Sequence, residues 1–268
     1  MEPRIVAGYD GSTRSRVAAH WAAREAARRE RPLHVVSVTR DVTAPSGADA
    51  ASLDTDPASL VAELCVEHPQ LAIKAVHFTG TPAETFTALT ASDAELLVLG
   101  TRGAGGWAGL PVGSVALSVA EQALVPVVLV PSGPLCRVTG AGLHAVALAV
   151  DPHDPAEAAA DFAFDMARRR RHRLRAVHGW FPPSREDGRS EWLYERAQCL
   201  ADAMRPWRHK YPEVRVDEDI VLGAVAPALA QVCERADLLV VGRSRTRLGS
   251  VVREVVARAR GPVAVVPS

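Results

Sequence analysis

An internal repeat constrains the fold of this chain more than any other feature of its sequence. The segment Leu-Leu-Val-Leu-Gly at 96–100 returns as Leu-Leu-Val-Val-Gly at 238–242, and Val-Pro-Val-Val-Leu-Val-Pro at 125–131 returns as Gly-Pro-Val-Ala-Val-Val-Pro at 261–267. One apolar run ends at Asp10 in the first half, and another ends at Asp151 in the second. Self-similarity of this kind predicts a tandem duplication.

Within the first half, apolar runs alternate with segments of helical periodicity. The helical segments lie at about 15–29, 57–67, 82–92 and 113–123, and the apolar runs lie at 4–9, 33–38, 71–78, 96–99 and 127–130. Continuous runs of Val, Leu and Ile are typical of parallel strands that are buried on both faces. The sequence therefore predicts an α/β protein with helices on both faces of each parallel sheet.

The second half repeats this order, with a helix at about 155–170 and apolar runs at 144–150, 173–180, 214–221, 238–242 and 261–267. The chain has 268 residues, enough for two domains that each bury a core. Residues 131–142 are rich in Pro, Gly and Ser and are predicted to link domains at 1–132 and 143–268. The polar, small-residue segment 41–56 is predicted to be a loop.

Composition argues against several classes of protein. The formal net charge is zero, the pI is about 7.1 and aromatic residues make up 5% of the chain, which disfavours binding to nucleic acid or to an anionic membrane surface. The four cysteines show no zinc-ligand or CxxC spacing. Neither a signal peptide nor a membrane span is visible, so we expect a cytoplasmic protein.

The arginine cluster at 168–171 and 173 resembles a nucleic-acid patch when it is taken alone. Its counterpart in the first half, Arg28, Arg29 and Arg31, also lies at the end of a predicted helix. Cations at that position complement the helix dipole, so we interpret both clusters as structural.

The glycine-rich stretch 100–114 is the best candidate for an anion cradle. Gly100, Gly103 and Gly113 let the backbone approach a ligand closely, and Ser114 opens the next predicted helix. In parallel sheets, ligands bind beyond the carboxyl ends of the strands where the strand order reverses. Asp10 and Gly100 both end strands, so they share one crevice if those strands are neighbours.

Three features together resemble the universal stress protein family, present here as two consecutive domains. They are Asp10-Gly11-Ser12 after the first strand, Gly80-Thr81-Pro82, and the pattern Gly100-x2-Gly103-x9-Gly113-Ser114 before a Pro-Val-Val-Leu-Val strand. The resemblance implies two Rossmann-like domains, each with a five-stranded parallel sheet of strand order 3-2-1-4-5. It also implies dimerisation through the last strand in many members and ATP binding in one branch.

The resemblance further implies which residues bind the nucleotide. The glycine loop would hold phosphates and ribose, Asp10 would contact adenosine or Mg²⁺, and Val38 would lie against adenine. Arg102 would add a cation that meets phosphate. The predicted ATP site comprises Asp10, Val38, Leu99, Gly100, Arg102, Gly103, Gly113, Ser114 and Val115, with Asp10 as the metal ligand. A purely structural alternative remains, in which the glycines turn the chain, Asp10 caps a helix and Val38 belongs to the core.

The second half departs from this pattern. Asp151 is retained, but Pro152-His153 replaces Gly11-Ser12, and Arg245 takes the place of the second glycine. Three residues separate Arg245 from Gly249-Ser250, too few to wrap a triphosphate. We predict that this half binds no ATP and packs as a pseudo-partner against the first. Its loop arginines, Arg243, Arg245 and Arg247, are predicted to be solvated, with anion binding as the alternative.

No HExxH, GxSxG, Walker A or paired-carboxylate motif appears in the sequence. Four histidines are predicted to be isolated within helices and strands, namely His20, His34, His68 and His77. His178 is predicted to be a core or strand-end residue. The sequence therefore predicts an ATP-binding stress-response regulator or sensor that binds one ATP per chain. The alternatives are a nucleotide-free interaction scaffold and a slow ATPase that uses Mg²⁺.

Overall fold

The computed structural model describes residues 2–39, 56–103, 112–132, 144–181, 189–244 and 247–268. It divides the chain into two compact units, residues 1–134 and 135–268, and each is described here by itself. Almost all of the predicted loop 41–56, most of the predicted linker 131–142 and Arg245 lie outside the described residues.

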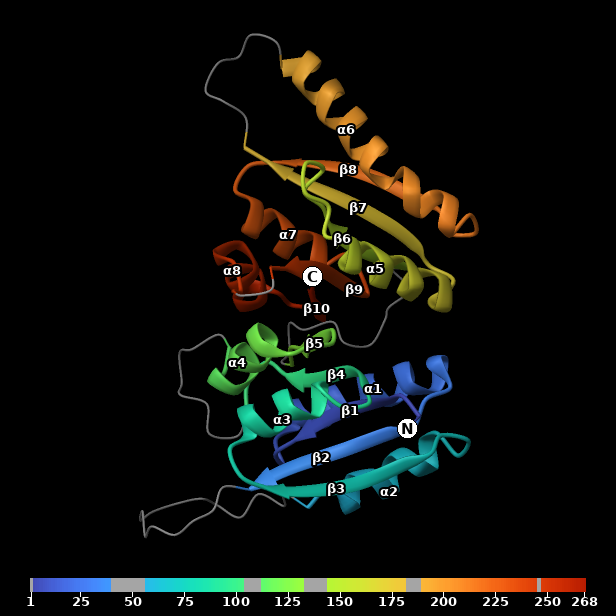
Figure 1. Cartoon of the computed structure of the whole chain (residues 1–268), viewed down its shortest axis with the longest axis vertical. Coiled ribbons are helices and arrows are strands. Elements are labelled where there is room, and N and C mark those ends of the chain that lie inside the picture. Colours follow the sequence, from blue (N-terminus) through green and yellow to red (C-terminus); the bar gives the residue numbers. More distant parts are fainter. Residues whose placement is uncertain (1, 40–55, 104–111, 133–143, 182–188, 245–246) are drawn as a thin grey trace. The chain divides into compact units, whose positions relative to one another are not determined.

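In the part of the first unit that the structure describes, helices and strands alternate along the chain (Figure 1). Its parallel sheet has the strand order β3-β2-β1-β4-β5, the order that the resemblance implied. Along the chain the elements are β1 (Arg4–Tyr9), α1 (Thr13–Arg29), β2 (Leu33–Thr39), α2 (Ala58–Glu67), β3 (Ile73–Thr79), α3 (Pro82–Thr90), β4 (Ala94–Gly100), α4 (Ser114–Gln122) and β5 (Val127–Val130).

Helices cover both faces of this sheet. α1 packs on β1, β4 and β5 and beside α2, whereas α3 and α4 pack against each other. The fully buried side chains include Ile5 of β1, Leu33 of β2, Leu64 of α2 and Leu97 of β4. These are the apolar positions that the sequence pattern placed in strands and on helix faces, so the predicted α/β class is confirmed.

The second unit repeats the arrangement, with the strand order β8-β7-β6-β9-β10 in a parallel sheet. Its elements are β6 (Ala145–Ala149), α5 (Glu157–Arg170), β7 (Arg173–Trp180), α6 (Arg189–Lys210), β8 (Val216–Leu222), α7 (Val225–Cys233), β9 (Leu238–Arg243), α8 (Ser250–Arg258) and β10 (Val263–Pro267). The long helix α6, with Pro206 inside it, was not predicted. It occupies the place in chain order that the shorter α2 has in the first unit.

The residues at the starts of two helices differ in whether their side chains make a capping hydrogen bond. Ser12 is the N-cap of α1, and its hydroxyl accepts a hydrogen bond from the Ser15 amide. Thr81 is the N-cap of α3 and Pro82 its first residue, but the Thr81 side chain makes no capping hydrogen bond. Thr81 therefore occupies the cap position without a capping hydrogen bond from its side chain.

The arginines at the end of α1 do more than complement a helix dipole. Arg29 is buried, with its guanidinium 2.7 Å from Glu25 and 2.6 Å from Glu95 on β4. In the second unit, Arg168 and Arg169 both pair with Asp165 at 2.7 Å and remain partly exposed. Arg29 is thus a buried link between α1 and the sheet, whereas Arg168 and Arg169 lie on a helix surface.

Two histidines that were predicted to be isolated have close polar neighbours, so that prediction was wrong. His20 on α1 lies 3.2 Å from Glu63 and 3.1 Å from Glu67, both on α2. His77 on β3 contacts the hydroxyls of Ser37 and Thr39 on the neighbouring strand. Residues more than 35 positions apart meet here through helix packing and strand register, which periodicity does not reveal.

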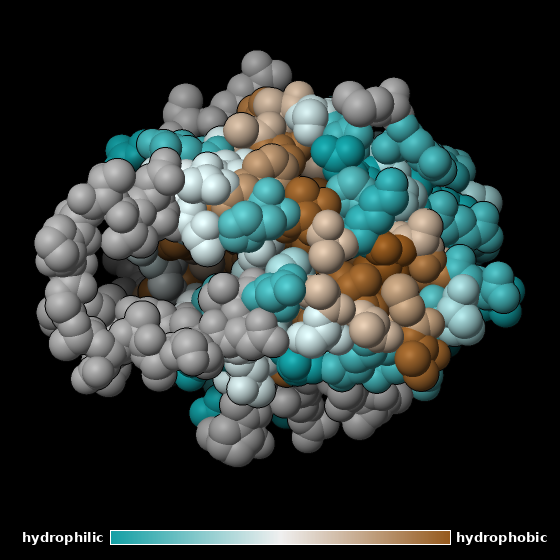
Figure 2. Space-filling model, turned by 90° about the horizontal axis from the view of Figure 1, so that it is seen from below, coloured by the Kyte–Doolittle hydropathy of each residue, from teal (hydrophilic) through white to brown (hydrophobic). Residues whose placement is uncertain are grey.

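The surface is mixed in character. On the face shown in Figure 2, hydrophobic residues lie between hydrophilic ones. In the first sheet the edge strand β3 exposes Lys74 and His77, polar residues of the kind that discourage pairing with another strand. Among the described residues, no helix combines the length and the apolar character needed to cross a membrane.

Candidate functional site

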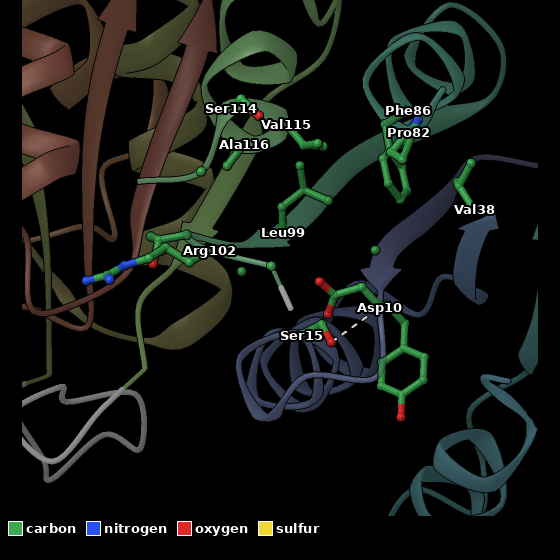
Figure 3. Close-up of a pocket in the computed structure, with 16 residues that line it drawn as sticks. Asp10, Ser15, Val38, Pro82, Phe86, Leu99, Arg102, Ser114, Val115 and Ala116 are labelled. Atoms are coloured by element: carbon green, nitrogen blue, oxygen red, sulfur yellow. Dashed lines mark hydrogen bonds between the residues drawn. The ribbon is translucent and has the colours of Figure 1, made fainter. Parts of the chain in front are cut away.

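A cavity of about 270 Å³ opens in the first unit where the strand order reverses, between β1 and β4. These strands pair directly, so Asp10 and Gly100 share one crevice as the sequence required. All nine predicted site residues line the cavity (Figure 3). They come from the ends of β1, β2 and β4, from the turn after β4 and from the start of α4.

The Asp10 carboxylate is held at one side of the cavity by the turn that follows β1. Its Oδ1 accepts hydrogen bonds from the Ser12 amide at 3.1 Å and from the Ser12 hydroxyl at 2.6 Å. Gly11 turns the chain there with a φ of 79°, which favours glycine. Because Ser12 caps α1, the alternative that Asp10 is simply the helix cap does not describe its contacts.

Gly103 faces the other oxygen of this carboxylate. A Cβ atom at Gly103 would lie 2.5 Å from Asp10 Oδ2, closer than non-bonded atoms approach. Glycine at this position therefore lets the turn after β4 lie close to Asp10 without a steric clash with the carboxylate.

The start of α4 forms the polar end of the cavity. Gly113 is the N-cap, and its amide already donates to the Thr101 carbonyl at 2.7 Å. The next three amides, of Ser114, Val115 and Ala116, have no acceptor within the helix because they belong to its first turn. The N-cap residue, Gly113, has no side chain that could cap them, so amide donors and the positive end of the helix dipole line the cavity at this point.

Apolar side chains form the opposite end. Val38 at the end of β2 lies across the cavity from Pro82 and Phe86 of α3, with Leu99 of β4 beside them (Figure 3). Gly8 on β1 makes room for this wall, since a Cβ there would overlap Leu99 and lie 2.9 Å from Phe86 Cζ. The cavity therefore offers an apolar wall and an anion-attracting helix start, separated by one carboxylate.

Known proteins resemble this chain over nearly its full length. A model of the universal stress protein family matches it twice, at residues 1–131 and 143–267. The chain belongs to the universal stress protein family. A universal stress protein of Mycobacterium tuberculosis is 32% identical over 300 residues, covering 97% of this chain and 94% of the relative. One of Mycobacterium bovis is 31% identical over 299 residues, with the same coverage.

A solved structure gives the same result for the fold. A universal stress protein from Archaeoglobus fulgidus superimposes with a TM-score of 0.67 at 17% identity, covering 98% of this chain and 96% of its own. The sequence resemblance to the universal stress protein family is thus confirmed, and so is the fold class with two domains of that type.

One predicted site residue of this universal stress protein points elsewhere. Arg102 lines the cavity, but its guanidinium extends away from Asp10 and Val115 (Figure 3). In this conformation the helix start, and not the Arg102 cation, offers the positive charge to an anion.

Sequence reasoning missed seven residues that also line the cavity. They are Gly8, Tyr9, Ser15, Pro82, Phe86, Thr101 and Ala116. Pro82 and Phe86 are four positions apart on α3 and hence share a helix face. The Gly80-Thr81-Pro82 motif marked the start of this helix, so that spacing was a usable signal for Phe86.

In the second unit of this universal stress protein, side chains pack against the glycines at the corresponding strand ends. A Cβ at Gly242, the counterpart of Gly100, would lie 2.5 Å from Ala156 Cβ. Gly179 takes the register position of Val38, and Val225 Cγ1 lies 2.8 Å from where its Cβ would be. His178 beside it is buried, with Nδ1 3.1 Å from the Val150 carbonyl. The position that presents a valine to the cavity in the first unit is therefore a glycine covered by Val225 in the second.

Proposed function

We propose that the first unit binds ATP and that the protein acts as a nucleotide-dependent regulator in stress responses. The observation that carries this proposal is the composition of one cavity, with an apolar wall of Val38, Phe86 and Leu99 at one end and the amides that begin α4 at the other. A purine is flat and apolar on its faces, and a polyphosphate is anionic, so the two ends match the two parts of the ligand.

The proposed pose assigns a task to each group. Adenine lies against Val38 and Leu99, and the phosphates accept hydrogen bonds from the amides of Ser114 and Val115. Asp10 lies between these ends, where a carboxylate oxygen can accept from a ribose hydroxyl or bind Mg²⁺. Mg²⁺ is commonly held by one or two carboxylates together with substrate phosphates, and Asp10 fits that donor set.

Binding is favoured over efficient hydrolysis. Among the described residues that line the cavity, Asp10 is the one carboxylate, and none is a histidine or lysine. A general base needs a titratable group within reach of the attacking water, and Asp10 is already engaged by Ser12. We therefore propose a sensor that responds to ATP binding at this site and not to ATP hydrolysis.

The proposal includes a stoichiometry of one ATP per chain. The second unit keeps the fold, but Gly179 takes the place of Val38, Arg245 takes the place of the second glycine, and three residues separate Arg245 from Gly249. A loop of this length is too short to wrap a triphosphate.

The test is to heat-denature the purified full chain and analyse the supernatant for adenine nucleotide, followed by calorimetric titration of nucleotide-free protein with ATP and Mg²⁺. We expect one site per chain and negligible turnover. Absence of both released nucleotide and binding heat would refute the proposal and favour the nucleotide-free scaffold. Two equivalent sites would refute the assignment to the first unit alone.

A further inference from the structure

A pair of histidines lies at the amino ends of the strands in the second unit, at the edge of the sheet opposite the crevice. His144 directly precedes β6, His172 directly precedes β7, and Asp237 directly precedes β9. β6 pairs with both β7 and β9, so the strand order brings the three side chains together.

The two imidazoles face each other through ring nitrogens. His144 Nδ1 is 3.4 Å from His172 Nε2, and the rings meet edge to face at 85°. On the other side of the His172 ring, Nδ1 lies 3.1 Å from Asp237 Oδ2, within ion-pair distance but without hydrogen-bond geometry. The nearby negative charge favours a proton on Nδ1, which leaves the lone pair of Nε2 on the side of His144.

This arrangement matches a metal site in distance and in its supporting group. Two nitrogens bound at about 2.0–2.1 Å to one tetrahedral Zn²⁺ are about 3.3 Å apart, and the observed separation is 3.4 Å. Metal-binding histidines characteristically donate their other ring N–H to a carboxylate, and the Asp237 carboxylate lies on that side of the His172 ring. His144 also has a φ of 47°, a left-handed conformation that is uncommon outside glycine.

The first unit shows what the same positions do without histidine. Counting from Asp10 and Asp151, Arg31 corresponds to His172 and Pro3 to His144. Leu96 and Leu238 take the same register position in their sheets, so Glu95 corresponds to Asp237. Arg31 and Glu95 form an ion pair at 3.0 Å, and neither Pro3 nor Arg31 has a side chain that ligates a metal. In both units a nitrogen-bearing side chain thus faces a carboxylate here, but at these positions only the second unit has two imidazoles.

Another cluster with metal-binding residue types, His20 with Glu63 and Glu67, is less suited to binding an ion. Each ring nitrogen of His20 already faces a carboxylate, at 3.2 and 3.1 Å, and Glu63 also pairs with Arg16. These contacts describe an ion-paired link between α1 and α2, and they provide an internal control.

We propose that His144 Nδ1 and His172 Nε2 bind a divalent late transition-metal ion of the Zn²⁺ class, with Asp237 as a positioning residue. Imidazole nitrogen is a preferred ligand for such ions. The two histidines leave coordination positions to water or to a further ligand. The site is independent of ATP binding, because it lies in the other unit at the other ends of the strands.

The test is Zn²⁺ titration of the full chain, tag removed and metal stripped, by competition with a chromophoric chelator. We expect one Zn²⁺ per chain. His144→Ala removes an exposed side chain, so it is expected to leave the fold intact by circular dichroism and to abolish this binding. Asp237→Asn is expected to weaken binding by about 10- to 100-fold with unchanged stoichiometry. The control His20→Ala is expected to bind as the wild type does.

Co²⁺ provides a second readout that a structural role alone would not produce. Tetrahedral or five-coordinate Co²⁺ has stronger visible absorption than the hydrated ion, and the band is expected to disappear in His144→Ala and His172→Ala. No Zn²⁺ binding at about 1 mM metal, unchanged binding in His144→Ala, or loss of binding in His20→Ala would each overturn the proposal.

Discussion

Replacing Gly113 with alanine tests whether glycine at this position serves the stability of the fold or the binding of the proposed ligand. Gly113 has φ −76° and ψ 154°, a conformation open to any residue. A Cβ there would lie 3.6 Å from the Thr101 carbonyl oxygen and 3.6 Å from Arg102 Cα, which is ordinary van der Waals contact. The fold therefore does not require glycine at this position, although the methyl group would lie in the space between the β4 turn and α4.

Gly249 gives a matched control in the second unit. It is the N-cap of α8 as Gly113 is of α4, and a Cβ there meets nothing within 4 Å. Alanine is a poorer N-cap than glycine, and this loss is opposed by about 0.4–1 kcal/mol from the reduced entropy of the unfolded chain. We expect both variants to stay within about 1 kcal/mol of the wild-type free energy of unfolding.

The effect on ATP should differ between the two variants. In Gly113→Ala, the methyl group keeps the phosphates from one charge-assisted hydrogen bond to the amides of Ser114 and Val115, worth about 1.5–3 kcal/mol. That range corresponds to a Kd raised roughly 10- to 150-fold. Gly249→Ala should bind ATP as the wild type does.

Calorimetric titration with ATP and Mg²⁺, alongside urea unfolding, measures both quantities in the same samples. Wild-type affinity in Gly113→Ala would refute the proposed phosphate position. Equal weakening in Gly249→Ala would refute the assignment to the first unit.

Three further predictions concern single groups. Asp10→Asn keeps an acceptor for Ser12 but removes the negative charge that would bind Mg²⁺. In paired ATP titrations with and without Mg²⁺, the gain in ATP affinity on adding the metal should therefore disappear. A persisting gain would exclude Asp10 as the metal ligand. Burial lowers the pKa of His34, and Arg4 and Lys74 lower it further against a smaller opposing effect of Asp93. The unfolded chain therefore binds a proton more readily than the fold does, and stability should fall as pH drops below the unfolded pKa of 6.5. Relative to wild type, His34→Gln should show a smaller loss of unfolding free energy between about pH 7.5 and about pH 5.5, and an unchanged loss would contradict this. Arg29→Met should cost about 3–5 kcal/mol in urea unfolding, because it removes the buried partner of Glu25 and leaves that carboxylate with Arg28 at 3.8 Å. Surface Arg168→Met should cost less than about 1 kcal/mol, and similar costs would contradict the buried link.

The predictability of the fold differs from that of the site. The strands and most helices follow from apolar periodicity, and β7 was predicted with the bounds that the structure has. Helix α6 was missed, because the preceding region carried no recognised start signal and Pro206 interrupts its pattern. Strand order came from the family resemblance, since periodicity does not encode which strands are neighbours.

At the candidate site, the glycine spacing located the loop residues, but the sequence did not reveal the wall that Phe86 completes. Phe86 lines the cavity because α3 packs over β4 and because Gly8 leaves room on β1. Those contacts join residues that are far apart in the chain, and they depend on the register between strands.

The sequence by itself determined the α/β class, the duplication and the asymmetry between a complete and a shortened loop. These are local properties, set by the spacing of apolar residues and glycines along one strand, turn or helix. Only the tertiary structure decided that Ala156 and Val225 pack against Gly242 and Gly179, that Arg29 is buried between two carboxylates, and that His144 faces His172. Each of these is a contact between separate elements, created by packing and strand order, and no local pattern specifies the distance at which such side chains meet.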